Sequence, residues 1–290
     1  IDTSGAYIPG HGTPTTILFG RNREYVGSTL RTVLGIRGEP STPDDPAQGL
    51  VWSSIIRLVD RSGEQNEFVS VGDSERALFH KHPWSIGGGG ASELKEVLEE
   101  NTTETLSARS ESIGITSFTL EDDLYILPMT AAVRDGMSTS MFRPMIVGDI
   151  VRDWTSGECE VSVFPYNEEF QPIKDDLANP SLRYLWHGRI GLSANKMFGG
   201  KTKLECGLKW FEYGRLTSHK LRTPLTIVFA FVATHNHFVL DRGGKVFKQS
   251  APVIKLPAGA SEADHLPLLG LLNSSTACFW MKQVFHDKGT

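Results

Sequence analysis

Residues 225–247 read L-T-I-V-F-A-F-V-A-T-H-N-H-F-V-L-D-R-G-G-K-V-F, and this stretch decides the fold class. Its runs 225–234, 237–240 and 245–247 are rich in β-branched and aromatic residues, which predicts three strands. The sequence Asp241-Arg242-Gly243-Gly244 supplies a turn between the second strand and the third. The stretch therefore places a strand-rich region in the second half of the chain.

Outward from this stretch, the chain carries both strand and helix patterns. Further strands are predicted at 32–36, 160–164, 208–213 and 253–256. Apolar residues at helical spacing predict helices at about 46–60, 265–273 and 275–285, and Ser92 is a suitable N-cap for another that runs to about residue 100. Residues 61–90 are polar and mixed. We therefore predict an α+β fold, with a mixed helical connecting region at 26–135, a strand-rich domain at 136–257 and a helical segment at 258–290.

The first 25 residues form a segment of their own. A Gly/Pro-rich loop at 4–14 lies between two predicted strands. Two strands without a sheet of their own need neighbours. Because the chain also begins at Ile1 rather than at a methionine, we expect it to be a piece of a longer protein.

The composition is that of a globular protein. Hydrophobic residues make up 39% of the 290 residues, which is enough to form a core. No apolar run approaches the ~18 residues that a membrane-spanning helix needs. The three cysteines are odd in number and far apart, which excludes a disulfide framework and is typical of a reducing compartment. We therefore expect a cytoplasmic protein with no membrane association.

Charge is unevenly distributed along the chain. The net charge is -5, which argues against a generic nucleic-acid binder. Residues 181–250, however, hold twelve Lys and Arg against three acidic residues and carry +9, so the remainder carries -14. A segment this basic in an acidic chain indicates either a surface that binds a polyanion or a solvated surface that keeps the protein soluble. If it binds DNA, the candidate contact residues are Lys201, Lys203, Lys209, Arg215, Lys220, Arg222, His235, Asn236, His237, Arg242, Lys245 and Lys248.

His235-Asn236-His237 follows the most apolar predicted strand. In a strand the two histidines point to the same face, which is compatible with a metal site, but the sequence identifies no third ligand. We therefore predict no metal here and instead expect these polar side chains to face a partner, because such groups hydrogen-bond to base edges. The aromatic residues Trp154, Trp186, Trp210 and Trp280 are either stacking platforms or core, and the pattern favours core.

Motifs of catalysis or cofactor binding are weak in this sequence. Gly87-Gly88-Gly89-Gly90 follows a poor strand pattern, which indicates a turn rather than a phosphate loop. Amino-methylating methyltransferases use an Asn/Asp-Pro-Pro-aromatic loop, and the nearest match, Phe164-Pro165-Tyr166, lacks its first two positions. We therefore assign no residue of this chain to catalysis or to cofactor binding.

Several long stretches together resemble one family. The chain is similar to the C-terminal part of the adenine-specific DNA methyltransferases of BREX phage-defence systems, and more broadly to the adenine methyltransferases of type IIG restriction enzymes. The stretches that carry the resemblance are D-T-S-G-A-Y-I-P-G-H-G-T-P-T at 2–15, V-L-G-I-R-G-E-P at 33–40, P-W-S-I-G-G-G-G-A at 83–91, G-D-I-V-R-D-W at 148–154, V-A-T-H-N-H-F-V-L-D-R-G-G at 232–244 and the more generic L-L-N-S-S at 271–275.

The resemblance implies a function for the longer protein. Its methyltransferase domain would precede this chain, with residues 1–25 as the last strands of that domain. S-adenosylmethionine would bind there, and the fragment alone would be inactive. The strand-rich region would then be the target-recognition domain that contacts double-stranded DNA, with other BREX proteins as further partners. Phosphate contacts would fix its register on the duplex, and a few polar side chains would read bases.

A protein-interaction module is the alternative. The acidic remainder of the chain would suit a basic partner subunit of a defence complex or self-association. A metal-dependent nuclease centred on His235 and His237 is a third, weaker hypothesis.

Overall fold

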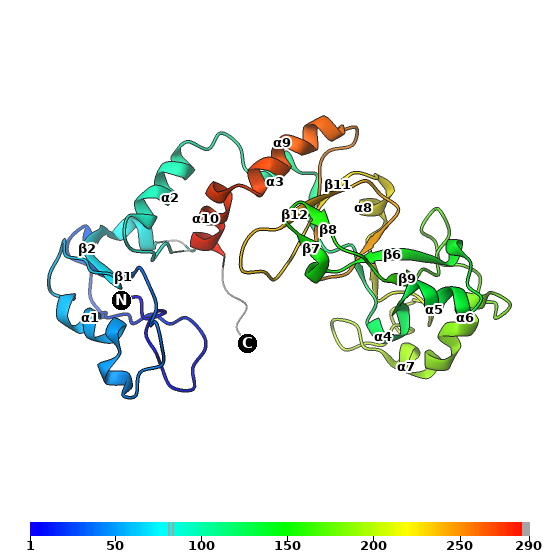
Figure 1. The fold of residues 1–290 in the computed structure, drawn as a ribbon, viewed down its shortest axis with the longest axis horizontal. Coiled ribbons are helices and arrows are strands. Elements are labelled where there is room, and N and C mark those ends of the chain that lie inside the picture. The colour runs from blue at the N-terminus through cyan, green and yellow to red at the C-terminus, as the bar shows by residue number, and fades with distance from the viewer. Residues whose placement is uncertain (81, 83, 286–290) are drawn as a thin grey trace. The chain divides into compact units, whose positions relative to one another are not determined.

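The computed structural model describes residues 1–80, 82 and 84–285, so Pro83 and the last five residues of the predicted 258–290 segment lie outside the described part. Two compact units make up the chain (Figure 1). Unit 1 holds Ile1–Thr103 together with the chain from Phe279 onward, and unit 2 holds Glu104–Cys278. The predicted connecting region 26–135 is thus divided between the two units. Among the described residues, no helix is both long and apolar enough to span a membrane.

Unit 1 is built on an antiparallel pair of strands and two helices. Strand β1 (Thr29–Gly35) pairs with β2 (Val69–Glu75) from Thr29↔Glu75 to Gly35↔Val69. Helix α1 (Leu50–Leu58) buries Val51, Ser54, Ile55 and Leu58, the spacing of one helix face, against these strands. Helix α2 (Ala91–Glu100) follows the glycine run, and short 3-10 turns lie at Pro46–Gln48 and Arg76–Phe79.

Unit 2 contains two four-stranded sheets. One has the order β12-β11-β14-β3 and is antiparallel throughout, and the other has the order β13-β6-β9-β5 with one parallel pair, β13 and β6. Two further pairs are β10 with β4 and β7 with β8. The strands of unit 2 are β3 (Ser112–Gly114), β4 (Ser117–Phe118), β5 (Ile126–Leu127), β6 (Phe142–Ile146), β7 (Val151–Arg152), β8 (Thr155–Ser156), β9 (Val161–Val163), β10 (Arg215–Leu216), β11 (Thr226–Phe229), β12 (Phe238–Asp241), β13 (Val246–Phe247) and β14 (Val253–Lys255).

Short helices accompany these sheets. They are α3 (Leu106–Arg109), α4 (Asp122–Tyr125), α5 (Met129–Arg134), α6 (Pro180–Leu185), α7 (Arg189–Ala194), α8 (Ser218–Arg222) and α9 (Glu262–Leu272), with 3-10 turns at Thr139–Met141, Gly148–Ile150 and Trp186–Gly188. Helix α9 begins at a capping box between Ser261 and Asp264. Helix α10 (Ser275–Val284) follows it after a short break, and its part from Phe279 onward belongs to unit 1. Mixed helices and several small sheets confirm the predicted α+β class.

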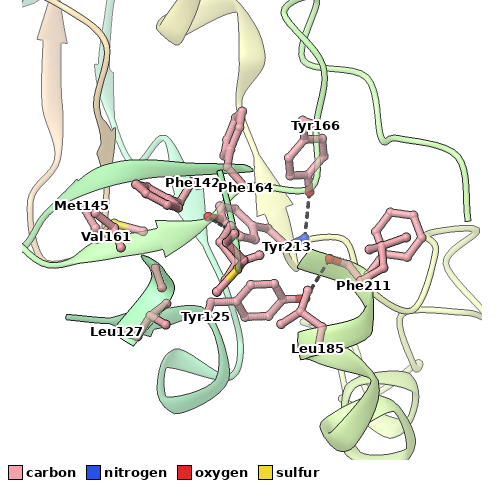
Figure 2. Packing of buried hydrophobic residues seen from close by; sticks show 14 of the residues in the cluster. Tyr125, Leu127, Phe142, Met145, Val161, Phe164, Tyr166, Leu185, Phe211 and Tyr213 are labelled. Carbon is pink, nitrogen blue, oxygen red and sulfur yellow. Dashed lines mark hydrogen bonds between the residues drawn. The ribbon is translucent and has the colours of Figure 1, made fainter. Parts of the chain in front are cut away.

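The larger core of unit 2 is unusually rich in tyrosine (Figure 2). The Tyr125 hydroxyl donates to the Phe211 carbonyl at 2.8 Å, and the Tyr213 N–H donates to the Tyr166 hydroxyl at 2.7 Å. The Tyr213 hydroxyl donates in turn to the Val163 carbonyl at 2.9 Å. All three rings are at most 6% exposed, so burial raises the pKa of each phenol. These bonds tie α4 and β9 to the segment around residue 211.

Several predicted elements differ from the observed ones. The segment 208–213, predicted as a strand, forms turns, because Trp210, Phe211 and Tyr213 are all buried and do not alternate between two faces. Within the fully described segment 1–25, an isolated bridge between Asp2 and Thr16 replaces the two predicted strands. Strand β2 lies inside 61–90, where no strand was predicted.

The glycine run at 87–90 forms the predicted turn. The Gly88 N–H donates to the Gly35 carbonyl at 2.8 Å, and a Cβ at Gly88 would lie 2.7 Å from the Leu34 carbonyl oxygen. Gly90, at a φ of +87°, is the N-cap of α2 in place of the predicted Ser92. The run therefore allows a close approach to β1.

We expect Tyr125→Phe to destabilise unit 2 while keeping its fold. The substitution leaves the buried Phe211 carbonyl without the phenol that donates to it, which costs about 1–3 kcal/mol. Urea denaturation should show this loss in the free energy of unfolding, whereas Tyr7→Phe, at an exposed tyrosine of unit 1, should change it little. An unchanged free energy in Tyr125→Phe would show that the hydroxyl is dispensable.

Candidate nucleic-acid interface

A tight turn projects just after α7, at residues 196–202, and we call it the finger. Lys196 and Thr202 form an antiparallel bridge at its base, and the Met197 N–H donates to the Lys201 carbonyl at 2.8 Å. Gly199 and Gly200 at its tip have φ values of +98° and +82°, which side chains disfavour. Phe198 is 97% exposed. The finger thus presents an aromatic ring to solvent on a turn that begins and ends near an exposed lysine.

The base of the finger is held by side-chain and backbone bonds. The Thr202 N–H and hydroxyl donate to one Glu205 carboxylate oxygen at 2.7 and 2.9 Å, and these bonds lower the pKa of Glu205. The Lys203 N–H donates to the Asn195 carbonyl at 3.0 Å. The position of the finger is therefore fixed at its base, whereas its tip is exposed.

Lys203, a predicted phosphate contact, requires a correction because its side chain is fully buried. Its ammonium donates to the Trp210 carbonyl at 3.3 Å and lies 5.8 Å from the centre of the Tyr125 ring. Burial lowers the pKa of Lys203 to about 8, against the weaker opposing effect of Glu212 and Glu121. Lys203 therefore belongs to the core and lies outside any exposed DNA-binding surface.

Several other predicted cations are engaged within unit 2. Lys220 is 8% exposed and requires the same correction. Lys209 is half-buried, and its ammonium donates to the Ile173 carbonyl at 2.8 Å. The remaining engaged cations form ion pairs, which are Arg242 with Glu262, Lys245 with Asp241, and Lys248 with Asp122. Lys201, Arg215 and Arg222 are exposed, as is Lys196, which the prediction did not include.

The His-Asn-His segment lies in the loop before β12 rather than within a strand. The Asn236 amide donates to the Leu272 and Ser274 carbonyls, the latter at 3.2 Å, so it anchors the loop to the end of α9. His237 is 5% exposed, and its burial and the nearby His235 lower its pKa. Of the three side chains, the structure leaves His235 the most accessible.

Two exposed aromatic residues lie on the β7–β8 turn and on the β11–β12 loop that carries the His-Asn-His segment. Trp154 is 52% exposed on the turn between β7 and β8, and Phe231 is 65% exposed on the loop between β11 and β12. The core prediction is confirmed for Trp210 and is wrong for Trp154 and Trp186, which are 52% and 43% exposed, while Trp280 is half-buried. Trp154 occupies a left-handed turn position. Sequence reasoning also missed Phe198, although the glycine pair that follows it is a turn signal.

The chain is similar over its whole length to one curated protein. It is 40% identical over 292 residues to the adenine-specific methyltransferase PglX of Streptomyces coelicolor, and it spans 24% of that protein's length. A structure of the Type IIL restriction-modification enzyme MmeI in complex with DNA resembles 64% of the chain and 24% of that enzyme, with a TM-score of 0.44 and 12% identity. No family model matches the chain.

Lys203→Met should raise the free energy of unfolding of unit 2 at neutral pH. This gain over the unsubstituted chain should disappear at high pH. Because the pKa of Lys203 falls from 10.5 to about 8 on folding, the unfolded chain binds the proton more tightly than the folded chain. The free energy of unfolding of the unsubstituted chain should therefore rise between about pH 8 and pH 10.5, by about 3 kcal/mol from this residue. Met removes the titrating group, so this rise should be missing from the variant.

Urea denaturation at a series of pH values measures the difference between the two proteins. Lys201→Met, at an exposed lysine of the finger, is the matched control and should leave the pH dependence unchanged. Parallel stability curves for Lys203→Met and the unsubstituted chain would contradict the prediction.

Proposed function

We propose that this chain is the target-recognition part of an adenine-specific DNA methyltransferase of BREX-type phage defence. The observation that carries the proposal is the 40% identity to PglX over the entire chain. Similarity of this extent, which covers the whole of this chain, supports a shared role for the matching part. The predicted domain 136–257 would be the region that contacts double-stranded DNA.

Exposed cations and the finger support a DNA-contacting role for unit 2. Lys196, Lys201, Arg215 and Arg222 have exposed side chains that would pair with phosphates and fix the register of the duplex. Phe198, near two of these lysines in the sequence, would contact the bases or sugars by its ring. A cationic turn with an aromatic tip suits a distorted duplex, which an enzyme that extrudes its target adenine must hold.

Base reading would depend on the loop that carries the His-Asn-His segment. His235 is exposed there, whereas Asn236 and His237 would act by holding the loop in place. We therefore assign sequence preference to the exposed part of this loop. The proposal keeps His235 as a contact residue and gives the other two a positioning role.

The methyl transfer itself would take place in the rest of the longer protein. S-adenosylmethionine would supply the methyl group that is transferred to the N6 atom of adenine. The residues of this chain do not fit that cofactor, because Phe164 and Tyr166 of the nearest motif are 2% and 6% exposed and pack in the tyrosine-rich core. We expect the chain alone to transfer no methyl group.

Unit 1 carries exposed apolar side chains near its start. Leu18, Phe19, Tyr25 and Val26 are between 68% and 83% exposed. Such side chains are suited to packing against another protein surface. They support the proposal that this segment packs on a methyltransferase domain, and they equally favour the second candidate function, docking of a partner subunit of a defence complex.

The double substitution Lys196→Gln and Lys201→Gln should weaken binding to mixed-sequence duplex DNA. For every lysine–phosphate pair that the substitutions remove, the steepness of log K against log salt should fall by about 0.9. Phe198→Ala should weaken binding by about 1–3 kcal/mol and leave that slope unchanged, because the ring carries no charge. Fluorescence anisotropy of the full 290-residue chain over a range of salt concentrations measures both effects.

Lys174→Gln is the matched control, since Lys174 is an exposed lysine of unit 2 outside the basic segment. Its binding and slope should equal those of the unsubstituted chain. Salt-insensitive or absent DNA binding by the unsubstituted chain would overturn the DNA-contacting role and favour the protein-docking function.

A further inference from the structure

Three side chains capable of binding a metal converge from two turns of unit 2. Asp153 lies on the turn between β7 and β8, and His235 and His237 lie on the loop between β11 and β12. One ligand atom from each lies within 4.8 Å of the other two. An Asp153 carboxylate oxygen is 3.2 Å from His237 Nδ1 and 3.9 Å from His235 Nε2. The third ligand that the sequence did not reveal is therefore supplied by a turn far away along the chain.

The turn that carries Asp153 has an unusual backbone. Asp153 and Trp154 are consecutive residues in the left-handed region, with φ values of 39° and 77°. Such a conformation is costly for residues other than glycine and persists where the surroundings impose it. It directs both the N–H and the carboxylate of Asp153 to the same histidine, because the Asp153 N–H lies 3.2 Å from His237 Nδ1.

The two histidines are held by neighbours that leave ring nitrogens facing Asp153. The Thr234 hydroxyl lies 3.1 Å from His235 Nδ1, which leaves Nε2 as the nitrogen that faces the carboxylate. Metal-binding histidines commonly have their second nitrogen hydrogen-bonded in this way. Asn236, between the histidines, is fixed to the end of α9, and His237 is almost fully buried.

We propose that Asp153, His235 and His237 form a zinc site that joins the β7–β8 turn to the β11–β12 loop. Two imidazoles and one carboxylate are a common donor set for Zn²⁺, which binds nitrogen and oxygen at about 2.0–2.2 Å. Ligands arranged tetrahedrally at that distance lie about 3.4 Å apart, close to the 3.2 and 3.9 Å found here. On binding the ion, His237 Nδ1 would give up the hydrogen bond that it accepts from the Asp153 N–H.

The chemistry of the donors selects the type of ion. Imidazole nitrogen suits Zn²⁺, Ni²⁺ and Cu²⁺, whereas Mg²⁺ and Ca²⁺ prefer sets of oxygen ligands. Arg152 is the cation next to the site, and its guanidinium donates to the Gly148 and Val151 carbonyls at 2.8 and 2.6 Å. With its guanidinium held by these two carbonyls, Arg152 leaves the Asp153 carboxylate available to the ion.

Titration of the full chain, purified without a polyhistidine tag, with Zn²⁺ alone tests the site. Calorimetry should show one ion per chain, and saturating Zn²⁺ should raise the midpoint of thermal unfolding. Asp153→Asn and His235→Gln each remove one ligand and should weaken binding more than tenfold and abolish the thermal shift. Thr234→Val removes the partner of His235 Nδ1 and should weaken binding about tenfold.

The control is His219→Gln, at an exposed histidine of α8, which should bind Zn²⁺ as the unsubstituted chain does. Mg²⁺ should produce no thermal shift in any of these proteins. The proposal is overturned if the unsubstituted chain does not bind Zn²⁺ at millimolar concentration, or if Asp153→Asn and His235→Gln bind it undiminished, which would place the ion elsewhere. Neither result would bear on the phosphate contacts and the Phe198 contact proposed above, because these are measured without metal and involve none of the three ligands. Where the ion binds, His235 Nε2 is a ligand and no longer contacts a base.

Discussion

Three buried tyrosines bring hydroxyl groups into the core of unit 2, and each hydroxyl must find a partner there because an unpaired buried hydroxyl is costly. Main-chain groups serve as partners for all three: the Phe211 and Val163 carbonyls accept, and the Tyr213 N–H donates. Main-chain partners fix the path of the chain as well as the side chains. The segment around residue 211 is therefore bound to α4 and β9 at several points. The finger, at residues 196–202, comes shortly before this segment in the sequence.

Elements that depend on neighbouring residues are predicted from the sequence, whereas the segment that depends on this tyrosine network is not. The strands at 226–229 and 238–241 and the two C-terminal helices follow from local patterns, because β-branched runs and helical spacing are properties of neighbouring residues. The segment 208–213 has an equally strong aromatic pattern, yet Trp210, Phe211 and Tyr213 are all buried in one core. Its backbone groups bond to distant tyrosines, and no local pattern contains that information.

The candidate site was predicted from charge, which is a property of composition rather than of position. Counting lysines cannot separate Lys201, which is exposed, from Lys203 two residues later, which is buried under Tyr125. The fold around Lys203 buries it, and this burial lowers its pKa. The charge of Lys203 therefore destabilises the folded chain and is not available to bind DNA. Asp153 escaped prediction for a related reason, since a ligand set completed from a distant part of the chain depends on the pairing of β7 with β8.

The finger and the proposed zinc site share one feature of backbone conformation. In each, a backbone in the left-handed region sets the direction of a functional group. Gly199 and Gly200 lie beside the exposed Phe198 at the finger, and Asp153 at the β7–β8 turn faces His237. At the finger the glycines adopt this conformation without strain. The Phe198 ring at the tip stays 97% exposed, with its centre 6.5 Å from that of the Phe118 ring. At Asp153 the conformation is costly, and a bound ion would offset the cost only if all three ligands engage it together. A rigid framework with exposed turns suits recognition. Turns whose backbone is already fixed lose little conformational entropy when the partner binds.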